Sequence, residues 1–364
     1  MGTYNLSETT PFIAVHPGEI LKDELKERGI TQKELSSMMK IPASVVNEII
    51  RGKRNLNADY ALAFSKVLSI PAETLMKLQS LYDLDKAKLE EKNVREVEAE
   101  NELTEYNHCF DVRTVLKRLG GSFSSAAESL LFLKEELQLQ SPAQMQIMFD
   151  GMFRKSARTG IDHRMVMTWK LLAENAASHI SVTSPYDKNR LPELASRLRD
   201  IFNENINTLN SLKIIFEEYG IIFGIVEKVD KASVDGYSFI CNGHPAIIIT
   251  KRYDRIDNLA FTVMHELGHV YLHFSSEDSA YIHISENADC SLPEREADAF
   301  AQESLIPDEI WRTAPKTAMN IAQIQSSYAR WAKSRGINKW IALGRVSHET
   351  GIWKFRQDSQ RAIN

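Results

Sequence analysis

Cysteine is scarce in this chain. Its 364 residues include only three, Cys109, Cys241 and Cys290, and they lie far apart. An odd number at such spacings argues against a disulfide framework and against a zinc site of the Cys-x-x-Cys type. The simplest interpretation is that they are buried, reduced thiols, so the cysteines point to no metal or redox function.

Long apolar runs and export signals are also missing. No stretch approaches the roughly 18 apolar residues that a membrane span requires. The segment from Met1 to Pro11 is polar and lacks the basic start and apolar core of a secretory signal. We therefore expect a cytoplasmic protein that has no membrane partner.

The chain lacks an excess of positive charge. Its formal net charge is −5, with 44 Lys and Arg against 49 Asp and Glu. Because phosphate neutralisation needs clustered Lys and Arg, any contact with DNA must be local. A chain of 364 residues also exceeds what one hydrophobic core usually organises, so we expect several domains.

Start and stop signals predict five short helices between residues 17 and 80. Pro17, early in the first helix, and Gly29, just after it, mark its two ends. Thr31 and Glu34 form a capping box that opens the second helix. The later signals are the Ile41-Pro42 turn, a third helix of about Ala43 to Arg51 closed by Gly52, the N-cap residue Asn57, and Pro71 at the start of the fifth helix.

The composition changes after this segment. Between Asp83 and Glu105 there are nine Asp and Glu against four Lys and Arg, which predicts a solvated helical linker that would repel phosphate. Helical spacing of apolar residues follows, without recognisable chemistry. Strands are then predicted at 221–226, 237–241 and 246–250, with an Asn242-Gly243 turn before the last, and helices at 257–274 and 292–305.

These patterns predict a multidomain, mainly α protein. We expect a five-helix helix-turn-helix domain at 12–82, an acidic helical linker at 83–109 and a helical middle region at 110–205. An α+β domain with a small sheet is expected at 206–318, followed by a helical or extended segment at 319–364.

The strongest chemical signal is His265-Glu266-Leu267-Gly268-His269, inside the predicted helix 257–274. Positions i and i+4 lie on the same helical face, so both imidazoles can bind one zinc ion. Glu266 is then placed to take a proton from a metal-bound water, whose pKa zinc lowers to about 7. The alternative is a surface helix with solvated histidines, but the apolar residues around the motif favour a buried site.

A catalytic zinc ion needs a third protein ligand. His273 is a poor candidate because it lies about 12 Å along the helix axis from His265. In the predicted helix 292–305, Glu294 and Asp298 share a face, which favours Glu294 as the ligand and Asp298 as acceptor for the N–H of a ligand histidine. Glu296 points about 200° away around the helix and is the weaker candidate.

Three segments of this region resemble the ImmA/IrrE family of metallopeptidases: His265-Glu266-Leu267-Gly268-His269, Glu294-Arg295-Glu296-Ala297-Asp298-Ala299-Phe300-Ala301 and Leu305-Ile306-Pro307. The resemblance covers about residues 206–311. It implies a gluzincin-like fold with Zn²⁺ on His265, His269 and Glu294, and with Glu266 as the general base.

The same resemblance implies proteolysis of a repressor-like protein substrate. An exposed strand edge, such as 246–250, could bind that substrate through backbone hydrogen bonds. The segment 344–349 also looks like one found near the C-terminus of such proteins. Its His348 either stabilises a tetrahedral intermediate or is a structural or surface histidine.

The predicted second and third helices fit helix-turn-helix geometry, in which the third lies in the major groove. The alternative is a small helical bundle used for protein contacts. The candidate DNA contacts are Ser44 and Asn47 to base edges, Gln32 to base or phosphate, and Arg51, Lys53 and Arg54 to phosphates.

Three segments resemble the HigA-type antitoxin branch of the phage-repressor helix-turn-helix family: His16-Pro17-Gly18-Glu19-Ile20-Leu21, Asn47-Glu48-Ile49 and Arg51-Gly52-Lys53-Arg54. The resemblance covers residues 12–82 and implies a homodimer on operator DNA, with control of the protein's own operon. The resemblance also suggests a toxin as a binding partner, although this chain is much longer than a stand-alone antitoxin.

Two functions remain. In one, the protein is a DNA-binding transcriptional regulator whose zinc-dependent endopeptidase cleaves a protein regulator. In the other, it is a non-proteolytic repressor or antitoxin whose zincin fold only senses or binds a partner. The presence of Glu266 favours the enzyme, because a binding module would not need a general base.

Overall fold

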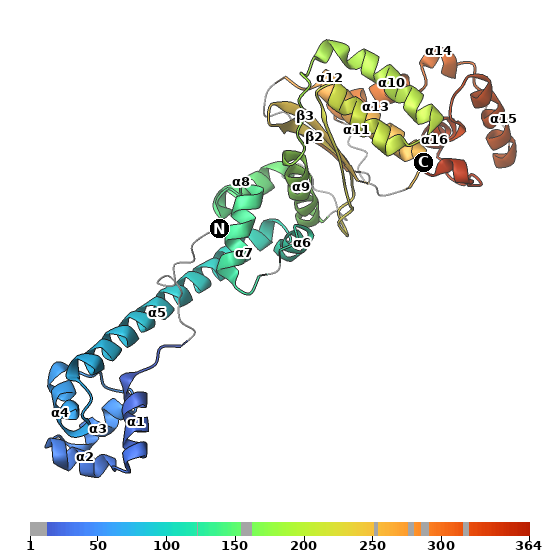
Figure 1. Cartoon of the computed structure of the whole chain (residues 1–364). Coiled ribbons are helices and arrows are strands. Elements are labelled where there is room, and N and C mark those ends of the chain that lie inside the picture. Colours follow the sequence, from blue (N-terminus) through green and yellow to red (C-terminus); the bar gives the residue numbers. More distant parts are fainter. Residues whose placement is uncertain are drawn as a thin grey trace. The chain divides into compact units, whose positions relative to one another are not determined.

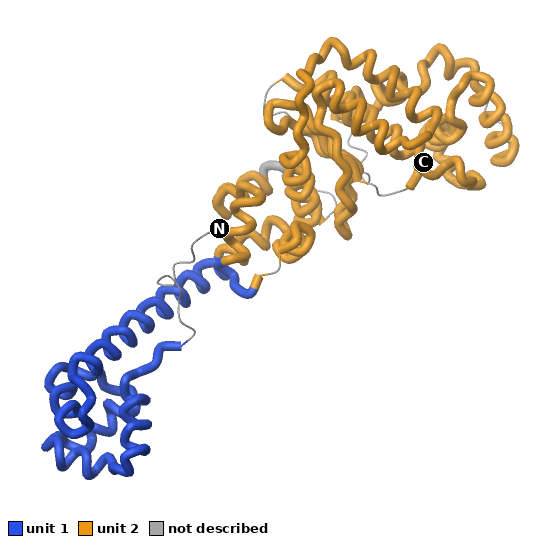
Figure 2. The backbone as a smooth tube through the Cα atoms, viewed as in Figure 1, with its two compact units in different colours: residues 1–101, 124–127 blue, residues 102–123, 128–364 orange. Residues whose placement is uncertain are grey.

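The computed structural model describes residues 13–121, 123–153, 162–250, 254–275, 280–284, 291–315 and 320–364. This part of the chain contains sixteen α-helices and one four-stranded sheet, which confirms the predicted mainly α, multidomain fold class (Figure 1). It divides into two compact units, residues 1–101 with 124–127, and residues 102–123 with 128–364 (Figure 2). No helix in the described ranges is long and apolar enough to cross a membrane. Cys290 lies outside them.

The first unit begins with the predicted short helices, whose bounds are α1 Pro17–Arg28, α2 Gln32–Met39, α3 Ala43–Ile50 and α4 Ala58–Leu68. The sequence signals act as expected. Thr31 and Glu34 form the capping box, the side chain of Asn57 accepts a hydrogen bond from Tyr60 N, and Gly29 ends α1 with φ 64°.

The fifth helix is much longer than its opening signals indicate. α5 runs from Ala72 to Cys109 without a break and includes the acidic segment. No Gly or Pro interrupts these residues, and i,i+4 ion pairs such as Lys86–Glu90 and Arg95–Glu91 support an exposed helix. Residues 102–109 of this helix belong to the second unit.

The packing of α1 in the first unit explains why histidine and glycine stand at positions 16 and 18. The imidazole of His16 caps α1 by accepting a hydrogen bond from Gly18 N at 2.9 Å. A Cβ on Gly18 would lie 2.2 Å from the carbonyl oxygen of Ile49, so only glycine lets α1 approach the end of α3 this closely. These residues therefore set helix packing.

After the end of α5, the second unit contains four helices from the middle of the chain, α6 Val112–Arg118, α7 Ala126–Leu137, α8 Pro142–Phe153 and α9 His163–Ser178. The first two residues of α7 belong to the first unit. Its sheet follows, with β1 Ile222–Val226, β2 Val234–Cys241, β3 His244–Thr250 and β4 Ala280–Ile284 in the order β1-β3-β2-β4. β1 is parallel to β3, and the other pairs are antiparallel. Asn242 and Gly243, both with positive φ, form the predicted turn between β2 and β3.

The prediction of an exposed strand edge at 246–250 is wrong. β3 is an inner strand, because Ile248 is in register with Gly224 of β1 on one side and with Tyr237 of β2 on the other. The pattern of alternating residues cannot distinguish an inner strand from an edge strand when both faces of the sheet are buried. β4, which the sequence analysis did not predict, lies next to β2 instead.

Helices cover both faces of the sheet, as Figure 1 shows. Ile222, Ile248 and Phe239 face the core that contains α9. Phe223 and Ile249 face the second core, formed by helices later in the chain. Those helices are α10 Leu191–Glu204, α11 Thr208–Glu218, α12 Ile256–Leu272, α13 Leu292–Leu305, α14 Asp308–Trp311, α15 Ile321–Ser334 and α16 Lys339–Thr350.

Candidate metal centre and nucleic-acid interface

Two packed helices, α12 and α13, carry the residues of the candidate metal centre. α12 is buried along most of its length, and it supplies His265, Glu266 and His269. Gly268 permits close packing, because a Cβ there would lie 3.1 Å from the Cα of Ala297 on α13. This approach brings Glu294 of α13 to the two histidines.

The three predicted ligands form a compact triangle. Nε2 of His265 lies 3.0 Å from Nε2 of His269, and each of these nitrogens lies 3.2 Å from a carboxylate oxygen of Glu294. Zinc–ligand distances of about 2.0–2.1 Å in a tetrahedral site place donor atoms roughly 3.3 Å apart. The donor set and its spacing therefore fit a zinc ion with one coordination position left for a small ligand.

Hydrogen bonds orient both histidines. Nδ1 of His265 lies 2.8 Å from Oδ1 of Asp298, the partner expected from the sequence. Nδ1 of His269 lies 3.0 Å from Nδ1 of His273, whose Nε2 lies 3.0 Å from Oε2 of Glu296. A proton on each Nδ1 of the two ligand histidines leaves both Nε2 atoms as metal donors. His273 and Glu296 thus orient the candidate ligand His269.

The electrostatics of the centre favour a cation. Burial by itself would lower the pKa of His265, but the carboxylates of Asp298, Glu294 and Glu266 raise it to about 10. Both ligand histidines and Glu266 have no solvent exposure. Because buried charges in proteins are paired or bind metals, this concentration of carboxylates around two imidazoles fits a divalent ion.

Glu266 lies beside the triangle on α12 and against strand β2. The Cβ that Gly236 lacks would lie 2.4 Å from Oε1 of Glu266 and 2.8 Å from its Cγ. A glycine at this position of β2 therefore makes room for the carboxylate. The sequence analysis missed this role, because Gly236 lies 30 residues before Glu266 in the chain.

On its other face, β2 is anchored to α9. The hydroxyl of Tyr237 donates a hydrogen bond to Glu174 at 2.9 Å, and Nζ of Lys170 lies 2.5 Å from the same carboxylate. Burial and the charges of Glu174 and Glu266 raise the pKa of Tyr237 well above its ordinary value. Tyr237 therefore keeps its proton, and this contact with α9 holds β2 beside Glu266.

His348 lies on α16 and packs against Phe261, which precedes His265 by one turn of α12. Its ring stacks on Phe261, with 6.0 Å between ring centroids, and the ring of Phe261 lies 6.1 Å from that of His265. Phe261 thus contacts both histidines, and His348 lines a pocket next to the centre.

The candidate DNA contacts lie on α2, α3 and the turn after α3. Ser44 is exposed, and Gln32 and Asn47 are partly buried. Val46, Ile49 and Ile50 point into the core. The cationic candidates Arg51, Lys53 and Arg54 are all exposed, and Arg54 forms an ion pair with Glu48 at 2.7 Å.

Comparison with known proteins covers both regions. Residues 21–75 match the helix-turn-helix family, and residues 218–338 match the IrrE N-terminal-like domain. Fold and site thus define a helix-turn-helix protein with a metallopeptidase-like domain. The chain belongs to the helix-turn-helix family through its N-terminal part. Its second part matches the IrrE N-terminal-like domain, and both matches agree with the sequence resemblances.

Individual relatives match about a fifth of the chain. Virulence-associated protein I of Dichelobacter nodosus is 34% identical over 82 residues, which are 22% of this chain and 76% of that protein. A HigA-family addiction module antidote protein from Coxiella burnetii is 32% identical over 22% of this chain and 88% of its own, with a TM-score of 0.21. The Pseudomonas aeruginosa antitoxin HigA, solved with the higBA promoter, is 36% identical over 22% of this chain and 89% of its own, with a TM-score of 0.22.

Proposed function

We propose that this protein is a DNA-binding transcriptional regulator that also cleaves a protein regulator with a zinc-dependent endopeptidase site. The observation that carries the enzymatic part is the triangle of His265, His269 and Glu294 with the carboxylate of Glu266 beside it. The family match at residues 218–338 supports it. A binding module that only senses a partner would not need this general base.

The chemistry divides between the ion and the chain. A bound zinc ion would lower the pKa of water to about 7 and polarise the carbonyl of the scissile peptide bond. Glu266 accepts the proton of the attacking water on its carboxylate and delivers it to the nitrogen of the leaving peptide. Gly236 leaves room for that carboxylate, and Asp298 and His273 hold the ligand imidazoles in the required tautomers.

Because β3 is an inner strand, we propose that the substrate binds along β4 instead. Among the described strands, β4 pairs with β2 alone, so its other edge can accept an extended peptide. β4 lies next to the centre, because Tyr281 stacks on His269 with 4.5 Å between ring centroids and 9° between ring planes. An added strand would therefore run past the ligands. In this proposal the added strand is a segment of a protein regulator of the repressor or antitoxin type.

The enzymatic proposal is tested by comparing cells that carry the wild type with cells that carry Glu266→Gln. New protein N-termini would be identified by mass spectrometry, and zinc in the purified proteins would be measured by elemental analysis. We expect new N-termini in the wild type alone and equal zinc in both proteins, because Glu266 is not a ligand. Cleavage that persists in the variant, or a wild type that binds no zinc, would leave the non-proteolytic regulator.

For the first unit we propose that a homodimer binds operator DNA, with α3 in the major groove. The support is the family match at residues 21–75 and the exposure of Ser44 at the start of α3. Asn47 contacts a base edge and Arg51 a phosphate. Because Glu48 already neutralises Arg54, we expect that arginine to contribute less than Arg51. A toxin partner is a further part of this proposal, as is a location in the cytoplasm.

The DNA proposal is tested by titrating the full chain with the duplex upstream of its own gene. Asn47→Ala should reduce the preference for this duplex over unrelated DNA, whereas Arg51→Ala should weaken binding to both and lower the salt dependence by about one ion. Arg95→Ala, a matched control, removes the same charge from the exposed middle of α5 and should change neither quantity. Unchanged binding in both α3 variants would identify the bundle as a protein-contact module.

A further inference from the structure

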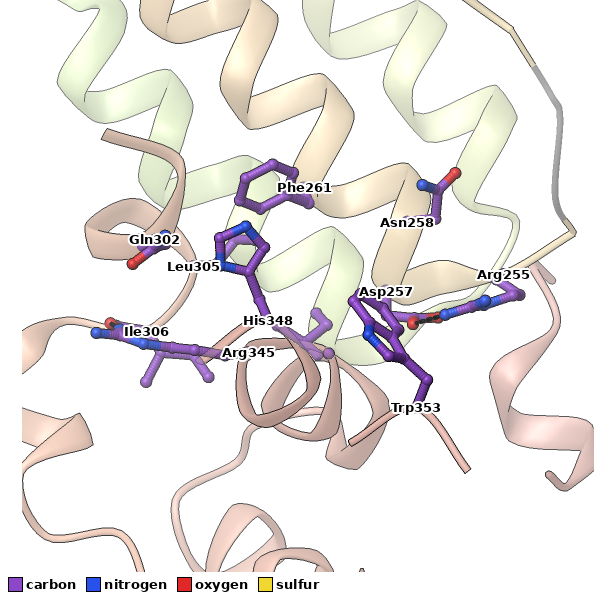
Figure 3. Close-up of a pocket in the computed structure, with 12 residues that line it drawn as sticks. Arg255, Asp257, Asn258, Phe261, Gln302, Leu305, Ile306, Arg345, His348 and Trp353 are labelled. Carbon is purple, nitrogen blue, oxygen red and sulfur yellow. Dashed lines mark hydrogen bonds and ion pairs between the residues drawn. The ribbon is translucent and has the colours of Figure 1, made fainter. Parts of the chain in front are cut away.

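A pocket of about 120 Å³ is lined by Phe261, whose ring contacts that of His265 in the candidate metal centre. Figure 3 shows the residues that line this pocket. Its walls come from α12, the end of α13, and α16. Phe261 precedes His265 by one helical turn, and Gln302 follows Asp298 by one turn. Phe261 is the point at which the pocket meets the centre, because its ring centroid lies 6.1 Å from that of His265. A side chain next to a peptide bond held at the centre could therefore extend past Phe261 into the pocket.

The lining is chiefly apolar. Phe261, Leu305, Ile306 and Ile341 contribute to it, and Leu305, Ile306 and Ile341 are buried. A rigid apolar cavity of about 150 Å³ is known to take up benzene, so about 120 Å³ suits a branched aliphatic side chain. The volume and the walls thus favour an apolar group of the size of leucine.

The charged residues of the pocket are balanced within the protein. Arg345 donates hydrogen bonds to the carbonyl of Ile306 and the carboxylates of Asp308 and Glu349. The carboxylate of Asp257 binds both Arg255 and Arg361. Three arginines therefore face three carboxylates. A charged ligand would meet no excess of opposite charge, so the pocket favours an uncharged occupant.

We propose that this pocket binds the apolar side chain of the substrate residue that flanks the scissile peptide bond, and so determines cleavage specificity. This inference rests on the proposed zinc endopeptidase function. His348 lines the pocket beside Phe261, on which its ring stacks, so the two rings form one wall of the pocket (Figure 3). Its role is to position the substrate side chain.

Small zinc-binding probes test this proposal with the zinc-loaded full chain. Acetohydroxamate has no side chain, whereas N-acetyl-leucine, N-acetyl-aspartate and N-acetyl-lysine hydroxamates place one next to the chelating group. Dissociation constants would be measured by calorimetry. We expect the leucine probe to bind at least about tenfold more tightly than the other three, because a few buried methylene groups supply that much discrimination.

Two variants at one position provide the matched control. Gln302 is partly buried on the pocket wall and is not a metal residue. Gln302→Trp fills the pocket and should remove the advantage of the leucine probe while leaving acetohydroxamate unchanged. Gln302→Ala keeps the pocket open and should retain the advantage.

The outcomes separate the two proposals. If acetohydroxamate binds in a zinc-dependent way but the leucine side chain adds nothing, the pocket inference is overturned and the metal centre stands. The same conclusion follows if Gln302→Trp keeps the full leucine preference. If no hydroxamate binds the zinc-loaded protein, the proposed function fails and the inference falls with it.

Discussion

The hydrogen bonds behind the two ligand histidines predict a ranked loss of zinc affinity. We consider three substitutions on α13: Glu294→Gln, Asp298→Ala and Glu296→Gln. The first changes a ligand. The second removes the carboxylate that lies 2.8 Å from Nδ1 of His265, and the third changes a carboxylate that reaches His269 only through His273.

The magnitudes follow from these positions. Loss of a partner that orients a ligand typically costs 10- to 100-fold in metal affinity. Asp298 contacts the ligand directly with a full charge, so we expect about 100-fold for Asp298→Ala. Glu296 is one imidazole farther away and its side chain is 48% exposed, so we expect no more than about tenfold for Glu296→Gln. Glu294→Gln should cost more than either.

The assay is competition for zinc between the purified full chain and a chromophoric chelator at fixed neutral pH. Glu303→Gln serves as the control, because Glu303 is an exposed carboxylate on the same helix and should have no effect. Unchanged affinity in Asp298→Ala would refute the reasoning that this carboxylate orients His265. A loss in Glu296→Gln as large as that in Glu294→Gln would mean that Glu296 is itself a ligand.

Two further predictions concern cleavage and stability. Gly236→Ala places a methyl group 2.4 Å from Oε1 of Glu266 and must displace that carboxylate, so cleavage should slow about 100-fold while zinc affinity stays unchanged. Time courses of the new N-termini check this, and full activity would contradict it. Asp257→Asn leaves Arg361 buried beside a neutral partner and should destabilise the second unit by about 3–5 kcal/mol in urea unfolding. Arg361 and Arg255 hold the pKa of Asp257 below its ordinary value despite burial. The wild type should therefore keep this stabilisation above about pH 4 and lose it at lower pH, whereas the variant should lack that acid dependence. Equal acid sensitivity of the two proteins would count against the pair.

The local elements of the fold were predictable from the sequence, because their causes are local. The capping box at Thr31, the N-cap Asn57 and the Asn242-Gly243 turn act within a few residues of themselves, and each forms as expected. The i,i+4 spacing of His265 and His269 likewise places two imidazoles on one face, whatever the rest of the chain does.

Local patterns misjudged how long elements run and which elements pair. The sequence predicted a short fifth helix followed by a separate helical linker at 83–109, but the two form one helix, α5, because nothing in the acidic segment stops a helix. β3 became an inner strand because β1, more than 20 residues earlier, pairs with its second side. A single strand contains no information about a partner that distant.

The sequence by itself determined the chemical identity of the centre: two imidazoles and a glutamate on one helix, with carboxylates on a later helix. Only tertiary packing decided which of these residues contact one another. Contacts between two helices depend on how the helices pack, and the spacing of residues along the sequence does not give that. Packing put His273 and Glu296 behind the candidate ligand His269, set Gly236 against Glu266, and brought α16 to line the pocket next to the candidate metal centre.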